Sequence, residues 1–130
     1  MPVQLNHTIV ASRHAEAGAR WFAELFGVDE PEEFGPFWQV MTANGVGLDF
    51  ATAADIHAQH YAFLVSEDEF TAIYGRVVGR GMDHWADPHQ HRPNEINHND
   101  GGRGLYWLDP SGHGMEIITR PYGSGEAAAE

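Results

Sequence analysis

The sequence contains no cysteine and no lysine among its 130 residues. Without cysteine, the chain can form no disulfide and no thiolate-bound metal site, so any metal ion must be held by nitrogen and oxygen atoms. Without lysine, it can form no Schiff base with a carbonyl substrate and has no lysine-containing phosphate loop. These absences exclude several common enzyme classes and leave histidines and carboxylates as the available metal ligands.

Positive charge is also scarce, since seven arginines stand against 19 acidic residues and the formal net charge is −12. A polyphosphate backbone repels such a chain, so we expect no nucleic-acid partner. No apolar run reaches the roughly 20 residues needed to span a membrane. The N-terminal residues also lack the charged and apolar regions of a signal peptide. We therefore expect a cytoplasmic protein with no membrane association.

Hydrophobic residues make up 42% of the 130 residues, and this fraction and this chain length suit one globular domain. Apolar periodicity in its first part predicts a strand, a helix and then two extended segments. Ser12 is predicted to be the helix N-cap, Gly27 the helix stop, and Asn44 and Gly45 a tight turn. The corresponding ranges are 4–11 for the strand, 13–26 for the helix, and 34–43 and 46–52 for the extended segments.

The second part of the chain repeats this order of elements. Ser66 is predicted to cap a helix that runs to Arg80 and stops at Gly81. A polar loop, residues 90–102, interrupts the extended segments that follow. The strand is expected at 59–65, and the three extended segments at 82–89, 102–109 and 114–119.

The two parts align if one insertion is allowed. His7 and His60 begin the first strands and lie 60 − 7 = 53 positions apart. Asp49 and Glu116 lie in the last strands and are 116 − 49 = 67 positions apart. The difference of 14 residues is about the length of the polar loop.

If the two sheets curve toward each other, these two histidines and two carboxylates can meet at one point. Imidazole and carboxylate ligands suit zinc, iron(II), manganese, nickel or cobalt. A buried carboxylate between apolar neighbours, as in "GMEII", is costly unless it is paired. The structural alternatives are a hydrogen-bonded histidine at a strand end and, for Glu116, a solvent-facing residue on an edge strand.

Four stretches resemble the vicinal oxygen chelate superfamily, which comprises glyoxalases, bleomycin-resistance proteins and extradiol dioxygenases. They are "LNHTIV", "ARWFAELFGV", "HYAFLV" and the more specific "YWLDPSGHGMEII". The resemblance implies an α+β fold of two βαβββ modules, about 4–52 and 58–120, whose curved mixed sheets form a metal-holding cup. The modules would form one domain, 1–123, and 124–130 would be a disordered tail. His113, in the turn before the last strand, is expected to be structural.

The resemblance also implies one divalent metal ion and a homodimer. The ligands of the metal ion would be His7, His60 and Glu116, with Asp49 as a further ligand. Asp49 and Glu116 would be the catalytic carboxylates, one of which leaves the metal to act as a base. The expected function is a metal-dependent lyase or isomerase acting on a small oxygen-rich substrate. The alternatives are an extradiol-type ring-cleaving dioxygenase and a metal-free protein that binds an antibiotic.

Residues 85–107 are long and polar for a connection in a compact domain, and such segments are usually functional or mobile. Their donors can orient an anionic or carbonyl-bearing substrate over the metal. The alternative is a solvated lid without such contacts. The expected substrate-binding residues are Trp85, Asn97, His98, Arg103 and Tyr106.

Replacing His60 or Glu116 with alanine is expected to abolish tight binding of a divalent metal, because each change removes one ligand. Elemental analysis of protein purified anaerobically without an affinity tag measures the effect. Retention of one equivalent of metal in both variants would contradict the ligand assignment.

Overall fold

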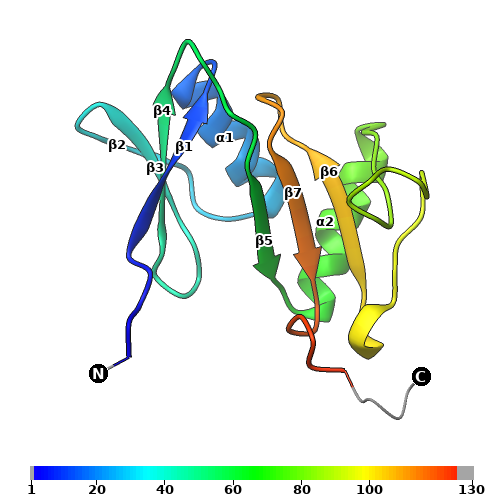
Figure 1. Ribbon diagram of the computed structural model, residues 1–130. Coiled ribbons are helices and arrows are strands. Elements are labelled where there is room, and N and C mark those ends of the chain that lie inside the picture. Colours follow the sequence, from blue (N-terminus) through cyan, green and yellow to red (C-terminus); the bar gives the residue numbers. More distant parts are fainter. Residues whose placement is uncertain (1, 126–130) are drawn as a thin grey trace. The chain divides into compact units, whose positions relative to one another are not determined.

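The computed structural model describes residues 2–125. The chain forms two compact units, Met1–His57 and Ala58–Glu130. Each unit contains one α-helix and one mixed β-sheet, with four strands in unit 1 and three in unit 2 (Figure 1). The predicted α+β class with two mixed sheets is confirmed.

In unit 1, the sheet has the strand order β1-β4-β3-β2. Strands β1 and β4 are parallel, whereas β3 is antiparallel to both β4 and β2. Helix α1 buries Phe22 and Leu25, and the ring of Phe22 lies 6.0 Å from that of Phe50 on β4. The elements are β1 (His7–Ser12), α1 (Ala15–Phe26), β2 (Glu32–Phe34), β3 (Phe37–Met41) and β4 (Gly47–Thr52).

The predicted N-cap of the first helix is wrong, because Ser12 is the last residue of β1. Its Cα partner across the parallel pair is Thr52, so the strand continues through the position where the helix was expected to begin. The N-cap is His14, which has no side-chain capping bond, and the Ala15 N–H donates to Thr52 Oγ1. The predicted stop is confirmed, since Gly27 has a left-handed φ of 69° that costs glycine little.

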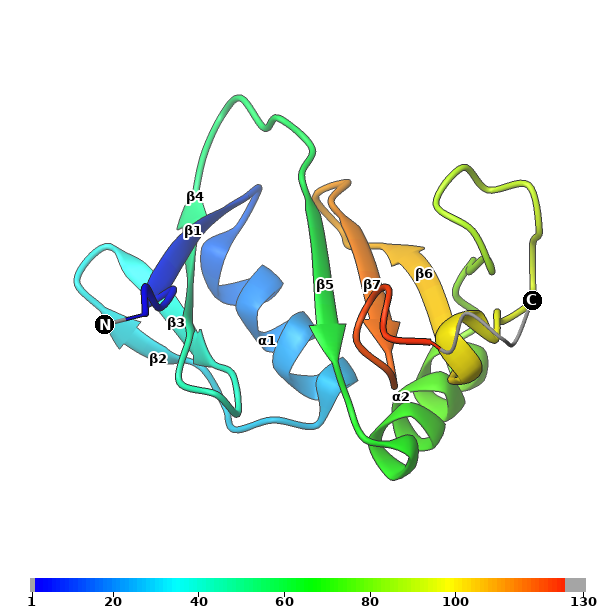
Figure 2. The same ribbon diagram turned by 60° about the horizontal axis from the view of Figure 1, so that its bottom comes forward.

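In unit 2, the sheet has the order β5-β7-β6, and α2 covers one of its faces (Figures 1 and 2). The predicted cap of α2 is confirmed as a capping box: Ser66 Oγ accepts from the Glu69 N–H, and Glu69 Oε1 accepts from the Ser66 N–H. The elements are β5 (His60–Leu64), α2 (Glu67–Gly79), the 3₁₀ turn η1 (Asn99–Gly101), β6 (Gly104–Leu108) and β7 (Gly114–Ile118).

The extended segment expected at 82–89 is wrong as a strand. Only Trp85 pairs there, exchanging two 2.9 Å backbone hydrogen bonds with Tyr106 on β6 and forming a second bridge to Pro93. Pro88 and Pro93 have no N–H to donate to a ladder, so the pairing does not extend. The fourth strand of this unit is thus reduced to a single residue, and the chain then leaves the sheet as the loop at 86–103.

The registers of the two sheets agree with the predicted single insertion. Across unit 1, one row of paired residues runs Ile9, Asp49, Gln39, Glu32; across unit 2, the equivalent row runs Ala62, Glu116, Tyr106, Trp85. The offsets are 62 − 9 = 53, 116 − 49 = 67, 106 − 39 = 67 and 85 − 32 = 53. The 14 extra residues therefore lie between Trp85 and Tyr106.

The turn "DPSGH" connects β6 to β7 and fixes where β7 begins. Asp109 Oδ1 accepts from the N–H groups of Ser111 and His113 at 2.9 and 2.8 Å, and Gly112 has a φ of 91°. His113 is fully buried, and its Nδ1 accepts from the Gln59 N–H at 3.0 Å. The structural role expected for His113 is confirmed.

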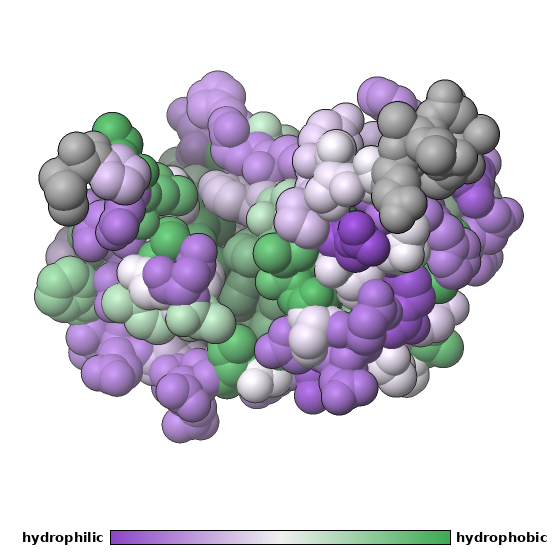
Figure 3. Space-filling view, turned by 90° about the horizontal axis from the view of Figure 1, so that it is seen from below, coloured by the Kyte–Doolittle hydropathy of each residue, from purple (hydrophilic) through white to green (hydrophobic). Residues whose placement is uncertain are grey.

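No helix in residues 2–125 is long and apolar enough to cross a membrane. On the face seen in Figure 3, hydrophilic residues alternate with hydrophobic patches. Of the predicted tail, Ser124 and Gly125 donate backbone hydrogen bonds to Pro121 and to the Asp100 carboxylate. Residues 126–130 lie outside the described residues.

We expect Ser66→Ala to lower the free energy of unfolding by about 1 kcal/mol, because it removes the acceptor of the capping box. Urea titration followed by circular dichroism measures the change. The variant Ser66→Thr keeps the hydroxyl and should stay close to the wild type. Equal losses in the two variants would show that the hydroxyl does not stabilise the helix.

Candidate functional site

The best-defined polar contact in unit 2 joins His60, the first residue of β5, to Glu116, in the middle of β7. These strands are parallel, and their register pairs His60 with Gly114 and Ala62 with Glu116. His60 Nε2 lies 2.8 Å from Glu116 Oε1. The histidine side chain is 50% exposed and the glutamate side chain only 10%. The buried carboxylate is therefore satisfied by an imidazole that is open to solvent.

Gly114 makes room for this contact. A Cβ at this position would come within 3.2 Å of His60 Nδ1, closer than most side chains tolerate. Because His60 is paired directly with Gly114, a larger residue there would push the imidazole away from the carboxylate. The glycine of "GHGMEII" thus has a steric role in the site.

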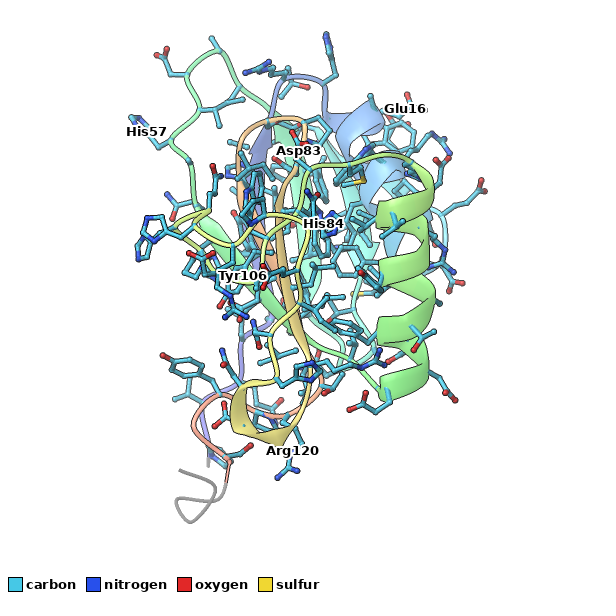
Figure 4. All side chains as sticks on the ribbon, turned by 90° about the vertical axis from the view of Figure 1, so that its right-hand side faces the viewer. Glu16, His57, Asp83, His84, Tyr106 and Arg120 are labelled. Carbon is cyan, nitrogen blue, oxygen red and sulfur yellow. The ribbon has the colours of Figure 1, made fainter. Side chains whose placement is uncertain are left out.

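Tyr106 is the second partner of the Glu116 carboxylate. It lies on β6 directly across from Glu116, and its hydroxyl is hydrogen-bonded to that side chain. Burial and this hydrogen bond raise the pKa of Tyr106 well above its usual value, so the phenol keeps its proton. In Figure 4, Tyr106 lies on the side of the sheet away from α2, whereas His84 lies nearer the helix. Tyr106 is thus a neutral donor that orients the carboxylate.

A small pocket of about 40 Å³ lies beside His60 and Tyr106, and Glu116 is not among its lining residues. The sheet contributes one wall and the beginning of the loop at 86–103 contributes the other. Its volume has room for only a few water molecules. The lining residues are His60, Trp85, Asp87, Pro88, Gln90, Tyr106, Trp107, Leu108, Gly114 and Met115.

Three of these pocket residues were expected from the sequence as ligand or substrate contacts: His60, Trp85 and Tyr106. Asp87 and Gln90 were not, because a single polar residue in a loop gives no periodic signal. The signal that could have found them is the turn sequence "ADPHQ", since aspartate followed by proline is typical of turns.

Asp87 shapes the loop rather than extending into solvent. Its carboxylate accepts from the N–H groups of His91 and Arg92 at 2.8 to 3.1 Å. Desolvation acts to raise the pKa of Asp87, but these backbone donors outweigh it and lower the pKa. The carboxylate therefore stays charged at neutral pH and holds the turn around residues 87–92.

Arg103 does not line the pocket. Its guanidinium donates to Glu67 Oε1 at 2.8 Å, to the Glu67 carbonyl at 2.9 Å and to Thr71 Oγ1 at 2.9 Å. It also lies over the ring of Phe70, 4.4 Å from its centre. All of these groups belong to α2, so the structure shows Arg103 fastening the end of the loop to the helix.

Asn97 and His98 are likewise placed away from the pocket. Asn97 is 4% exposed, and its Nδ2 donates to the Ala86 carbonyl at 2.8 Å. Its backbone exchanges two hydrogen bonds with Gly104, where a Cβ would lie within 2.6 Å of the Asn97 amide. His98 is exposed and precedes η1. Asn97 closes the base of the loop, and His98 lies on its outer surface.

In unit 1, the corresponding carboxylate has a different partner. Asp49 is 3% exposed and accepts from Gln39 Nε2 at 2.8 Å, and Gln39 is the residue equivalent to Tyr106. His7 is exposed, and its Nδ1 lies 2.7 Å from Asn6 Oδ1. Unit 1 therefore has the same framework, with an amide as the donor to its buried carboxylate.

The chain was compared with protein families, curated proteins and solved structures. No protein-family model matches it, and neither does any curated protein. Oxidase ChaP-H1 is 54% identical with a TM-score of 0.91, covering 94% of this chain and 99% of that chain. Oxidase ChaP-H2 is 55% identical with a TM-score of 0.93, covering 97% of this chain and 100% of that chain. The chain belongs to the family of these two oxidases.

More distant structures share the fold. A glyoxalase / bleomycin resistance protein from Catenulispora Acidiphila DSM 44928 is 19% identical with a TM-score of 0.64, covering 91% of this chain and 100% of that chain. These structures confirm the fold that the resemblance to the vicinal oxygen chelate superfamily implies. Members commonly use a divalent metal.

The His60 and Glu116 pair fits a divalent metal. Two ligand atoms at right angles, each about 2.1 Å from one ion, lie about 3 Å apart, close to the 2.8 Å between Nε2 and Oε1. Nitrogen and oxygen donors suit a borderline or hard ion. Within either unit, residues 2–125 contain no group of three or more histidine, aspartate or glutamate side chains that could hold a metal by itself. His7 and Asp49 therefore stay predicted ligands.

Asn97→Ala is expected to lower the free energy of unfolding by about 2 kcal/mol, because it leaves the Ala86 carbonyl without its donor in a buried position. His98→Ala, at the neighbouring exposed residue, should change it by less than about 0.5 kcal/mol. Urea unfolding of both variants measures the difference. A similar small effect for both would show that Asn97 does not fasten the loop.

Proposed function

We propose that the protein is a metal-dependent oxidase that uses dioxygen to oxidise a small oxygen-rich substrate, of which only the oxygen-bearing end enters the small pocket of unit 2. The observation that carries this proposal is the identity of 54% and 55% to two oxidases over almost the whole chain. From the sequence, a lyase or isomerase was expected first and a dioxygenase as an alternative. The identity to two oxidases reverses this order. The homodimer and the cytoplasmic location remain predictions.

His60 and Glu116 are the proposed metal ligands of unit 2. A metal ion bound there would polarise the oxygen atoms of a substrate and, if redox-active, provide a path for electrons toward dioxygen. Glu116 keeps a fixed orientation because the Tyr106 hydroxyl donates to it. The His60 side chain is half exposed, so a ligand can approach it from solvent.

The remaining pocket residues position the substrate and limit water. Trp85, Leu108 and the buried Met115 contribute apolar surface to the lining of the pocket. Excluding water strengthens the electrostatic interactions inside such a site. Because Arg103 is bound to α2, no arginine is among the described residues that line this pocket. Of the anionic or carbonyl-bearing substrates expected from the sequence, the lining therefore suits the carbonyl-bearing one better.

The proposal predicts oxygen consumption that depends on both substrate and metal. Metal-free protein should be reloaded separately with iron(II), manganese, cobalt, nickel and zinc, and oxygen uptake followed with catechol and hydroxyacetone, which both have adjacent oxygen atoms. We expect uptake with a redox-active ion. We expect His60→Ala and Glu116→Gln to reduce it at least about a hundredfold, since each loses a metal ligand or its charge.

Tyr106→Phe separates orientation from metal binding. It should retain the metal but lower the turnover rate at least about tenfold, because a hydrogen bond to a charged group is lost. If the protein instead converts the hemithioacetal of methylglyoxal and glutathione without oxygen uptake, it is an isomerase and the oxidase proposal is wrong. Absence of metal uptake would favour the metal-free binding protein.

A further inference from the structure

The loop at 86–103 contains all three non-glycine residues with positive φ in the described part of the chain: Gln90, Asn94 and Asp100, at 62°, 62° and 58°. Asparagine and aspartate tolerate this left-handed conformation because their short side chains can bond locally. Glutamine has no such advantage. Gln90 is therefore the residue whose backbone conformation needs a separate explanation.

Gln90 is also the only one of the three that lines the pocket beside His60 and Tyr106. A sparsely populated backbone conformation persists only where the surroundings enforce it, and such residues gather at functional sites. At Gln90, the surroundings are the turn described above: its N–H donates to the Asp87 carbonyl at 3.3 Å, and the Asp87 carboxylate binds the next two N–H groups. The turn thus fixes Gln90 at the edge of the pocket.

We propose that Gln90 is a substrate-binding residue that determines specificity, and that Asp87 is the positioning residue that holds it there. A primary amide both donates and accepts, so it recognises an uncharged hydroxyl or carbonyl oxygen. The other polar side chains of the lining are acidic, imidazole, phenolic or indole, and none of them is an amide: Asp87 is bound to backbone amides, and Tyr106 is bound to Glu116. Gln90 thus supplies the amide at the mouth of the pocket.

This inference rests on the proposed function only in taking the pocket of unit 2 as the substrate site. The internal comparison supports a role specific to the second unit. The pocket wall that contains Gln90 belongs to the segment with the 14 extra residues, for which unit 1 has no counterpart. The framework for the carboxylate is present in both units, whereas this wall is present in one.

The test is direct binding, which requires no turnover. Protein labelled with ¹⁵N should be titrated with catechol and with hydroxyacetone under nitrogen. The side-chain amide signal of Gln90 is assigned by its disappearance in Gln90→Gly. We expect at least one of the two compounds to shift this signal, and Gln90→Gly to bind that compound about five- to tenfold more weakly, the loss of one hydrogen bond.

The choice of glycine separates binding from folding. Glycine adopts positive φ without strain, so Gln90→Gly should melt at or above the temperature of the wild type while binding more weakly. The matched control is Asn94→Gly, at a left-handed residue of the same loop that does not line the pocket. It should bind like the wild type. Asp87→Asn should weaken binding as Gln90→Gly does, because it loosens the turn.

The proposal is overturned by a Gln90 signal that neither compound moves, or by unchanged affinity in Gln90→Gly. Failure of the proposed function looks different, since a protein that binds catechol through Gln90 but consumes no oxygen with any metal is not an oxidase. Equal weakening in Gln90→Gly and Asn94→Gly would also overturn it, by showing that the loop acts only as a whole.

Discussion

The buried carboxylate of Glu116 is the constraint on which the rest of unit 2 depends. A negative charge on a central strand between apolar neighbours is stable only if partners compensate for the lost water. The parallel register of β5 and β7 brings His60 to it, and the antiparallel register of β6 brings Tyr106. The turn at Asp109 to His113 sets the register of β6 and β7, and His113 links this turn to the start of β5 by accepting from the Gln59 N–H. A shift of one residue would turn Glu116 toward the helix.

The sequence predicts the fold well where periodicity and turn residues agree. Some local patterns favour a single conformation, and the structure contains it in each case. These are the helix cap of Ser66 with Glu69, the helix stop at Gly27 and the "DPSGH" turn. Ser12 is different, because a good helix cap also suits a strand end, and the pairing with Thr52 decided between them. The segment at 82–89 has a strand-like composition, but with Pro88 inside it and Pro93 after it only Trp85 pairs.

Parts of the site could also be predicted, and for a clear reason. His60, Glu116, Tyr106 and Trp85 lie on paired strands, where alternation determines the face of each side chain. Loop residues have no such rule: Arg103 has the chemistry of a substrate contact, yet its guanidinium is bound by groups on α2. Gln90 belongs to no binding motif and yet lines the pocket, whereas Arg103 does not. Only the path of the chain in three dimensions distinguishes the two residues.

The loop at 86–103 is closed at its base independently of its tip. Ala86 and Asn97 bind each other, Asn97 pairs with Gly104, and Arg103 is fastened to α2. Closing a loop costs conformational entropy, and this cost rises only slowly with loop length. Here the cost is offset by contacts of residues that take no part in the pocket wall. Residues 87–91, which lie beyond the bridge of Trp85 to Pro93, therefore form a segment that can be exchanged. Natural variation or laboratory grafting can change their length and composition, and hence the mouth of the pocket, without altering the sheet that holds the carboxylate.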